Sequence, residues 1–330
     1  MPGVSDTINY DSFFTSTTKN YRTDLTKNFL LYRPAVNLLF DNYGHMERGG
    51  YAIQQPLEFG DNAPTKMFTP YGKADVTPTE FANPAIIPFR RAISAAVVSE
   101  EEMDANSGKS ALFDLMMGRI RLAERSVAKL IGNQIYSDGT SFGGNTFQGL
   151  AAGVSITPDV DPASGPVHGV PVGPNPWWKN QATVNCGSFA AHGVRGSTDD
   201  LVFNMFLNCS DGAYDRPSAI LSDQIPFEGY NAALLQIARQ IDPYKVGDLS
   251  FAALEYQGMP WYWDRQCPSG RMYLLNTKAV YFEIDPSVQF KWSDKRTWPD
   301  QLLDIRILSL RTTLVFRSRM FLGVLDGWTL

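Results

Sequence analysis

Cysteine and histidine are scarce in this sequence, and their scarcity rules out several kinds of site. Only three of each occur among 330 residues. The cysteines stand far apart without a CxxC or Cys/His ligand pattern, so we expect buried, reduced thiols and no zinc site. The histidines lie in loop-like sequence without an HExxH pattern, which predicts surface or structural roles. The six residues are Cys186, Cys209, Cys267, His45, His168 and His192.

Charged side chains are also few. They make up 19% of the sequence, below the roughly 25% of an ordinary soluble domain. The formal net charge is −5, which argues against a protein that coats nucleic acid through a basic surface. A chain with few charges but 12% aromatic residues indicates a surface that partners cover in part.

Long apolar runs are missing as well. None approaches the ~18–20 residues that a membrane-spanning helix needs. The first residues lack a basic stretch followed by an apolar one, so we expect no signal peptide. The sequence predicts a soluble protein that is made in a cytoplasm and contacts no membrane.

The usual catalytic motifs are absent too. Ser107-Gly108-Lys109-Ser110 resembles the end of a phosphate-binding loop, but Met103 stands where that motif requires its first glycine. No GxSxG motif occurs, and the aspartates do not follow a calcium-binding frame. We therefore expect no catalytic residue, no cofactor and no metal.

The clearest pattern in the chain is a helical period over residues 109–136. Its apolar residues recur at steps of three to five, and no proline interrupts the run. They are Leu112, Met116, Ile120, Ala123, Val127, Leu130 and Ile135. Arg121, Arg125 and Lys129 fall four residues apart on another face. A helix of this length, about 40 Å at 1.5 Å per residue, indicates a structural spine.

Two stretches before this helix alternate with the period of a strand. Tyr51, Ile53, Leu57 and Phe59 mark the first. Ile87, Phe89, Ile93, Ala95 and Val97, interrupted by Arg91, mark the second. Pro56 and Pro88 confine both to an edge or to a free-standing ribbon. The two strands predict a projecting hairpin with a long proline-rich tip, which needs a surface to lie on.

The remaining segments predict a mixture of helices and strands. Residues 1–44 form an extended arm with a short helix near 24–31 or 35–40. The acidic Glu100–Glu102 precedes the spine and suits its start. A strand at 219–221 precedes a helix from Ser222, and the C-terminal third reads as strands that end in a long apolar run from Leu303. No βαβ rhythm is visible, so the fold class is α+β.

This order of elements resembles the major capsid proteins of tailed bacteriophages, which have the HK97-type fold. Four local stretches share the resemblance, and it covers nearly the whole chain. They are 131–139 (IGNQIYSDG), 175–181 (NPWWKNQ), 216–223 (RPSAILSD) and 258–277, with Cys267-Pro268-Ser269-Gly270 at its centre.

The resemblance implies a division of the chain. Residues 1–44 would be the N-terminal arm and 45–98 the E-loop hairpin. Residues 99–198 would form the peripheral P-domain with spine helix 109–136, and 199–281 the axial A-domain. Residues 282–330 would be C-terminal strands returning to the P-domain.

The resemblance also implies partners. Copies of the chain would form pentamers and hexamers of an icosahedral shell that encloses double-stranded DNA, together with portal, scaffolding and decoration or cement proteins. Assembly would take place in the bacterial host cytoplasm and the product would be the virion. We expect inter-subunit or lumen-facing roles for Arg121, Arg125, Lys129, Tyr51, Ile53, Phe59, Phe89 and Arg91. Some relatives form a lysine–asparagine crosslink, but neither Lys66 nor Lys73 matches that site, so we predict none.

Three alternatives remain open at this point. An encapsulin-like nanocompartment shell resembles the same fold. An enzyme with an unrecognised site would differ in forming a monomer or small oligomer. The paired tryptophans would also suit a carbohydrate- or partner-binding virion protein.

Overall fold

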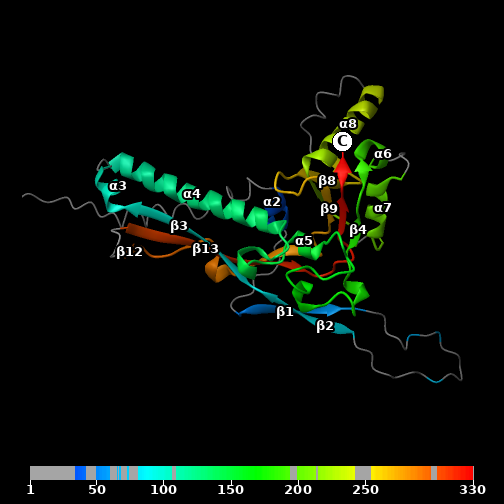
Figure 1. Ribbon diagram of the computed structural model, residues 1–330, viewed down its shortest axis with the longest axis horizontal. Coiled ribbons are helices and arrows are strands. Elements are labelled where there is room, and N and C mark those ends of the chain that lie inside the picture. The colour runs from blue at the N-terminus through cyan, green and yellow to red at the C-terminus, as the bar shows by residue number, and fades with distance from the viewer. Residues whose placement is uncertain are drawn as a thin grey trace, which may run out of the picture.

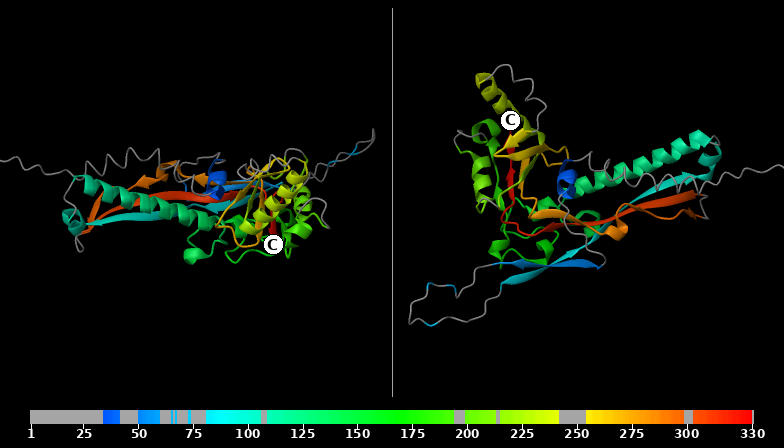
Figure 2. Two further views of the ribbon diagram at one scale, coloured as in Figure 1. Left: turned by 90° about the horizontal axis from the view of Figure 1, so that it is seen from above. Right: turned by 180° about the vertical axis from the view of Figure 1, so that it is seen from behind.

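A computed structural model of the chain describes residues 34–41, 50–59, 65, 67, 73, 81–105, 109–193, 199–212, 215–241, 254–298 and 303–329. These residues form a mixed α+β fold in which a five-stranded and a six-stranded sheet meet at one core. Figure 1 shows an L-shaped molecule, with the five-stranded sheet in its long limb and the six-stranded sheet upright. Figure 2 shows from above that the long limb is a thin layer. No helix among the described residues could cross a membrane.

Strand β13 (Leu303–Phe316) is the axis of the five-stranded sheet. Strand β3 (Arg90–Ser99) runs antiparallel along one of its edges. Along the other edge lie β12 (Arg296–Trp298), β11 (Lys291–Trp292) and β10 (Val280–Ile284), all antiparallel to it. The short helix η4 (Pro286–Val288) joins β10 to β11.

Helix α4 (Lys109–Ile135) confirms the predicted spine and lies along β3 on one face of this sheet (Figure 1). Helix α3 (Glu100–Ala105) connects the two at the far end of the limb. The predicted period is correct where side chains are described, since Ile120, Ala123 and Val127 are all buried.

The expected second strand is wrong in its extent. It divides into β2 (Ala82–Pro88), which pairs with β1 (Ala52–Glu58), and β3, which pairs with β13. Pro88 ends the β1–β2 ribbon because proline has no N–H to donate. The buried positions also change: they are odd-numbered through Phe89 but even-numbered at Ala96 and Val98. Ile93, which shares the predicted alternation with Ile87 and Phe89, is 60% exposed.

The six-stranded sheet has the order β4–β14–β9–β6–β8–β7. Its strands are β4 (Gln181–Thr183), β6 (Ala219–Ser222), β7 (Leu254–Tyr256), β8 (Met259–Trp263), β9 (Arg271–Leu275) and β14 (Gly323–Asp326). Helices α6 (Phe189–His192), α7 (Leu201–Asn208) and α8 (Gln224–Ile241) pack on it. The predicted buried strand at 219–221 and the helix that follows it are confirmed.

The C-terminal strands do not all return to the five-stranded sheet. After β13 the chain crosses to the six-stranded sheet, where β14 pairs with β4 and β9. Strand β15 (Trp328–Thr329) then pairs with β5 (Gly187–Ser188). Both β4 and β5 lie within residues 99–198, so the expectation that residues 282–330 return to the P-domain stays a prediction. Gly323 permits this path, because a Cβ there would lie 2.7 Å from the sulfur atoms of Met205 and Cys209.

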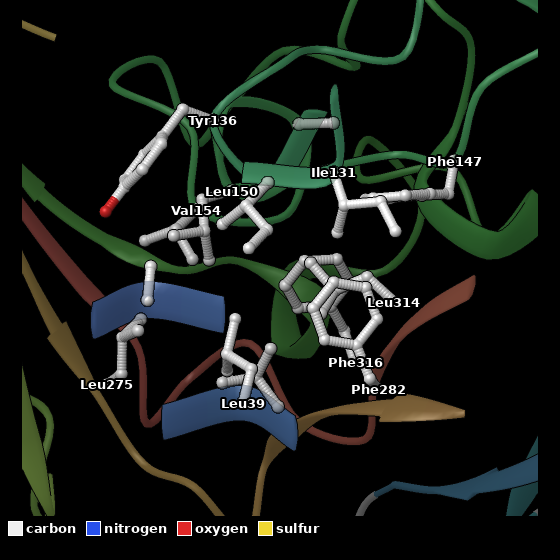
Figure 3. Close-up of a cluster of buried hydrophobic side chains, with 14 of the residues drawn as sticks. Leu39, Ile131, Tyr136, Phe147, Leu150, Val154, Leu275, Phe282, Leu314 and Phe316 are labelled. Atoms are coloured by element: carbon white, nitrogen blue, oxygen red, sulfur yellow. The ribbon is translucent and has the colours of Figure 1, made fainter. Parts of the chain in front are cut away.

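The two sheets share one core where the limbs meet. Helix α2 (Pro34–Asp41) lies there, which confirms the second of the two predicted N-terminal helices; residues 24–31 lie outside the described part of the chain. Figure 3 shows Leu39, Ile131 and Phe316 converging from α2, α4 and β13. The connecting segment after α4 contains η1 (Ser141–Gly144), α5 (Leu150–Gly153), η2 (Val167–Gly169) and η3 (Pro176–Trp178).

Candidate assembly surfaces

The β1–β2 ribbon lies on the body of its own chain along one face. Ile53 and Ile87 form a buried cluster with Phe89, Tyr281 and Val315 of the body. Farther along the ribbon, Phe59 stacks on Trp177 of η3, with ring centroids 4.9 Å apart and planes 6° apart. The prediction of a free-standing, projecting ribbon is therefore wrong for its base, because alternation predicts an apolar face but not what that face touches.

The other face of the ribbon is open. Ile86 on this face is 54% exposed, and Tyr51 (92%) and Phe81 (68%) are exposed just before β1 and β2 begin. Pro56, Pro84 and Pro88 are exposed on the same ribbon. Of the residues predicted to contact a neighbour here, Tyr51 is available, Phe59 is half-buried, and Ile53 and Phe89 are enclosed by their own chain.

The five-stranded sheet has one covered face and one open face. In its register, Ala96 pairs with Arg306 and Val98 with Asp304, so these even-numbered positions face α4. The odd-numbered positions face the other way, and among the described residues the ribbon covers this side at the end near β10. We name the uncovered part the open sheet face. It comprises Arg91, Ile93, Ala95, Val97, Lys291, Arg296, Ile305 and Ile307.

The open sheet face is both apolar and basic. Ile93 and Ala95 are exposed, and Ile305 and Ile307 are half-buried. Arg91, Lys291 and Arg296 are exposed around this apolar strip. Arg311, opposite Arg91 in the ladder, is held by Asp285 over 2.7 Å, and this contact helps to keep the pKa of Asp285 below its ordinary value. Among the described residues Arg91 has no ion-pair partner, so its charge is free to meet another molecule.

A groove lies where β3, α4 and η1 meet, beside the open sheet face. Its cavity of about 290 Å³ is lined mainly by apolar side chains, among them Ile93, Leu130 and Phe142. Phe142 is 67% exposed and has a φ of 53°, a backbone conformation that is costly for a non-glycine residue. Arg90 also lines the groove, and its buried Nε has no hydrogen-bond partner.

The basic face predicted on the spine is present. Arg121, Arg125 and Lys129 are all exposed on α4. Arg119, which lies two residues before Arg121, pairs with Glu102 of α3 over 2.9 Å. Glu124 lies beside this face with one carboxylate oxygen buried and unpaired. Burial raises the pKa of Glu124 to about 7, against the opposing effect of Arg121.

Helix α7 carries apolar side chains on both of its faces. Val202 and Met205 are buried against the six-stranded sheet. Phe203 and Phe206 stack with centroids 6.4 Å apart, Phe206 also packs against the buried cluster of the sheet, and Leu207 is 51% exposed. An outward apolar face on a surface helix is typical of a protein–protein contact.

The described residues contain no arrangement suited to catalysis. Burial raises the pKa of Cys186 to about 11 and that of Cys209 to about 12, so both thiols stay protonated and unreactive. No group of three or more His, Cys, Asp or Glu side chains in the described ranges could hold a metal ion. His168 is buried and His192 lies 3.3 Å from Asp199, while His45 lies outside the described ranges.

Two buried polar groups were missed by the sequence analysis. Arg319 is fully buried, with its Nε donating to the Gly153 carbonyl over 2.7 Å. Asp264 is buried at the junction of the limbs, where it accepts hydrogen bonds from the Tyr136 hydroxyl (3.1 Å) and the Ala35 N–H (3.4 Å). Burial and this carboxylate both raise the pKa of Tyr136. Arg319 stands outside the named stretches, whereas Asp264 lies within the stretch 258–277, but nothing in that stretch indicates its burial or its partners.

Comparisons with known proteins bear on the fold. No protein-family model and no curated protein sequence matches the chain. Among solved structures, the capsid asymmetric unit of cyanophage A-1(L) has a TM-score of 0.58 at 16% identity, covering 90% of this chain and 93% of that one. The capsid of a native GTA particle has a TM-score of 0.53 at 10% identity, covering 88% and 90%.

A third likeness is to a cellular shell. The SrpI encapsulin complex from Synechococcus elongatus has a TM-score of 0.52 at 12% identity, covering 90% of this chain and 88% of that one. These likenesses span nearly the whole chain and show that it has the HK97-type capsid fold, which confirms the expected fold class.

Proposed function

We propose that the chain is a major capsid protein, which assembles with copies of itself into the icosahedral head of a tailed bacteriophage. The observation that carries this proposal is the open sheet face, because Ile93 and Ala95 are exposed in the middle of the longest β-ladder of the molecule. Exposed apolar surface on a long strand invites association. In a fold shared with phage capsids, many copies of the same chain are the partner that would cover it.

In this proposal the ribbon and the open sheet face supply the two sides of the contact. The distal part of the ribbon, the E-loop, lies on the open sheet face of a neighbouring subunit. Such a contact is heterologous, since it joins different surfaces of the two copies, and it closes into pentamers and hexamers. The five-stranded sheet with α4 is the P-domain in this arrangement, and the six-stranded sheet with α6, α7 and α8 is the A-domain near the capsomer centre.

The remaining parts of the proposal concern the particle. It encloses double-stranded DNA without sequence recognition, and the basic face of α4 looks toward the lumen or a neighbour's arm. Portal, scaffolding and decoration or cement proteins complete the virion, which is assembled in the host cytoplasm. The subunit has no catalytic role.

A nanocompartment shell is the second candidate, supported by the likeness to the encapsulin over 90% of the chain. Its particle would hold an enzyme as cargo in place of DNA. Nucleic acid that co-purifies with particles and resists nuclease favours the phage head, whereas a single co-purifying protein favours the compartment.

The test is a substitution on the open sheet face. Ile93→Glu places a charge in the proposed contact, so we expect a folded protein that no longer forms particles in negative-stain images. Val160→Glu is the matched control: Val160 is 62% exposed on the connecting segment after α5, and particles should persist. Particle formation by I93E at the wild-type level would contradict the proposed contact.

A further inference from the structure

His168 of η2 joins the connecting segment to the end of β13 through an unprotonated ring nitrogen. The backbone N–H of Phe316 donates to Nε2 of the His168 ring over 2.9 Å. The backbone N–H of His168 donates to Gln148 Oε1 over 3.1 Å. The ring is buried, with its centroid 5.4 Å from that of Phe316 and 6.5 Å from that of Trp178. A proton on Nε2 would replace the acceptor in this contact by a second donor.

The charged groups around the ring also oppose a positive charge. Arg319, which follows β13, is fully buried, and it bonds the Gly153 carbonyl and Asn180 Oδ1 with no carboxylate in contact. Asp161 of the connecting segment stabilises Arg319 from a distance. Arg90 is a further charged group near the ring, and it lines the same cavity as His168 on the side of the ribbon. Burial, and then Arg319, lower the pKa of His168 to about 3.

The ring also lies beneath the ribbon. A cavity of about 210 Å³ separates the connecting segment from β2, with His168 and Gly169 on one side and Ile86, Ile87 and Pro88 on the other. Strand β2 and η2 are direct neighbours in the fold. Whatever moves η2 therefore moves one wall of this cavity, directly beside β2.

We propose that His168 is an acid-sensitive catch for the ribbon: a proton on its ring separates η2 from β13 and loosens the base of β2. A protonated ring can no longer accept the Phe316 N–H, and Arg319 opposes its charge, so protonation favours an opening of η2 that brings the ring into water. The inference goes beyond the proposed function, because the ribbon base lies on its own chain whether or not its tip reaches a neighbour.

Hydrogen exchange of the full-length protein, corrected for intrinsic rates, tests the catch. We expect the protection of the Phe316 amide and of residues 82–88 to fall between pH 7 and pH 4.5. The expected factor is roughly 70, the ratio that linkage gives when opening restores the pKa of His168 from about 3 to its ordinary value of 6.5.

Two variants separate His168 from the carboxylates that titrate in the same range. His168→Gln keeps an acceptor for the Phe316 N–H but takes up no proton, so its protection should stay nearly constant with pH. His192→Gln changes a histidine of α6, which packs on the six-stranded sheet. This variant should show the same loss of protection at low pH as the wild type. Should H168Q not fold, His168→Asn replaces it. Constant protection in the wild type, or an equal loss in H168Q or H168N, would overturn the catch. Whether particles form is scored separately and leaves this result unaffected.

Discussion

At single residues of the chain, burial of an ionisable side chain disfavours its charged form. Glu124 is the clearest example, since its half-buried carboxylate has an oxygen without a partner on a helix rich in cations. Its pKa is raised to about 7 by burial, so the ionised form is the one that the folded state disfavours.

This shift predicts a pH dependence with a definite sign. The pKa of Glu124 is higher in the folded state than its unfolded value of 4.5. The protonated side chain therefore contributes its full stability below pH 4.5. This contribution is lost as the pH rises through about 7. Glu124→Gln should therefore raise the free energy of unfolding at pH 8 and leave it nearly unchanged at pH 4.5. Urea denaturation at the two pH values measures this; an equal effect at both would contradict it.

Two glycines allow a test of packing with opposite signs. A Cβ on Gly153 would lie 2.1 Å from the Phe316 ring, whereas Gly118 on α4 has no atom within 4 Å of such a Cβ. Gly153→Ala should destabilise the fold by about 1–3 kcal/mol through overpacking. Gly118→Ala should stabilise it by about 0.5–1 kcal/mol through helix propensity. Thermal unfolding compares them; a harmless G153A would mean that this part of the core is looser than described.

At the scale of elements, Leu57 and Ala85 bury the ribbon in the main core, and two further contacts with its own body can be tested. One is the cluster of Ile53 and Ile87 with Val315, and the other is the stack of Phe59 on Trp177. The stack lies nearer the tip, so it sets the direction in which the ribbon leaves the body. Aromatic pairs of this kind contribute about 0.5–1.5 kcal/mol beyond area burial.

Removing either ring should release the distal ribbon. Phe59→Ala and Trp177→Ala should each speed limited proteolysis between β1 and β2 by roughly 2- to 12-fold, the factor that corresponds to that energy. The double variant should add little, because both remove the same contact. Phe81→Ala is the control, since this ring is 68% exposed. Fully additive effects of the two substitutions would show that the rings do not act as a pair.

The elements also show what the sequence could and could not predict. The period of α4 and the buried strand β6 follow from local pattern, because one face of each packs within the chain. The division of β2 from β3 could not be predicted, since apolar residues continue at odd positions through Ile87, Phe89 and Ile93. Only tertiary structure separates the enclosed Ile87 from the exposed Ile93. The crossing of β14 into the six-stranded sheet likewise depends on contacts distant in sequence.

For the candidate surfaces, residue spacing predicted which side chains are exposed on α4, but strand alternation did not predict what the ribbon contacts. The low charge indicated a surface that partners cover in part, which stays a prediction, and the three cations on α4 are exposed as their spacing implies. Ile53 and Phe89, however, are enclosed by their own chain. Alternation identifies which residues share a face but not whether that face meets the same molecule or another.

As a whole, the described part of the molecule is L-shaped with a thin long limb (Figures 1 and 2). The open sheet face, the outer side of the ribbon and the outer face of α7 lie on different limbs. Three separate apolar surfaces require several neighbours at once, as in a closed shell built from heterologous contacts.

The most direct test of this account is the mass of the purified protein in solution. Sedimentation velocity of the full chain over a wide concentration range should detect capsomers or closed particles of many 36.7 kDa subunits, and I93E should remain small and folded. A wild-type protein that stays a stable, well-folded monomer at the highest concentration, with the ribbon tip protected from protease by its own body, would contradict the account.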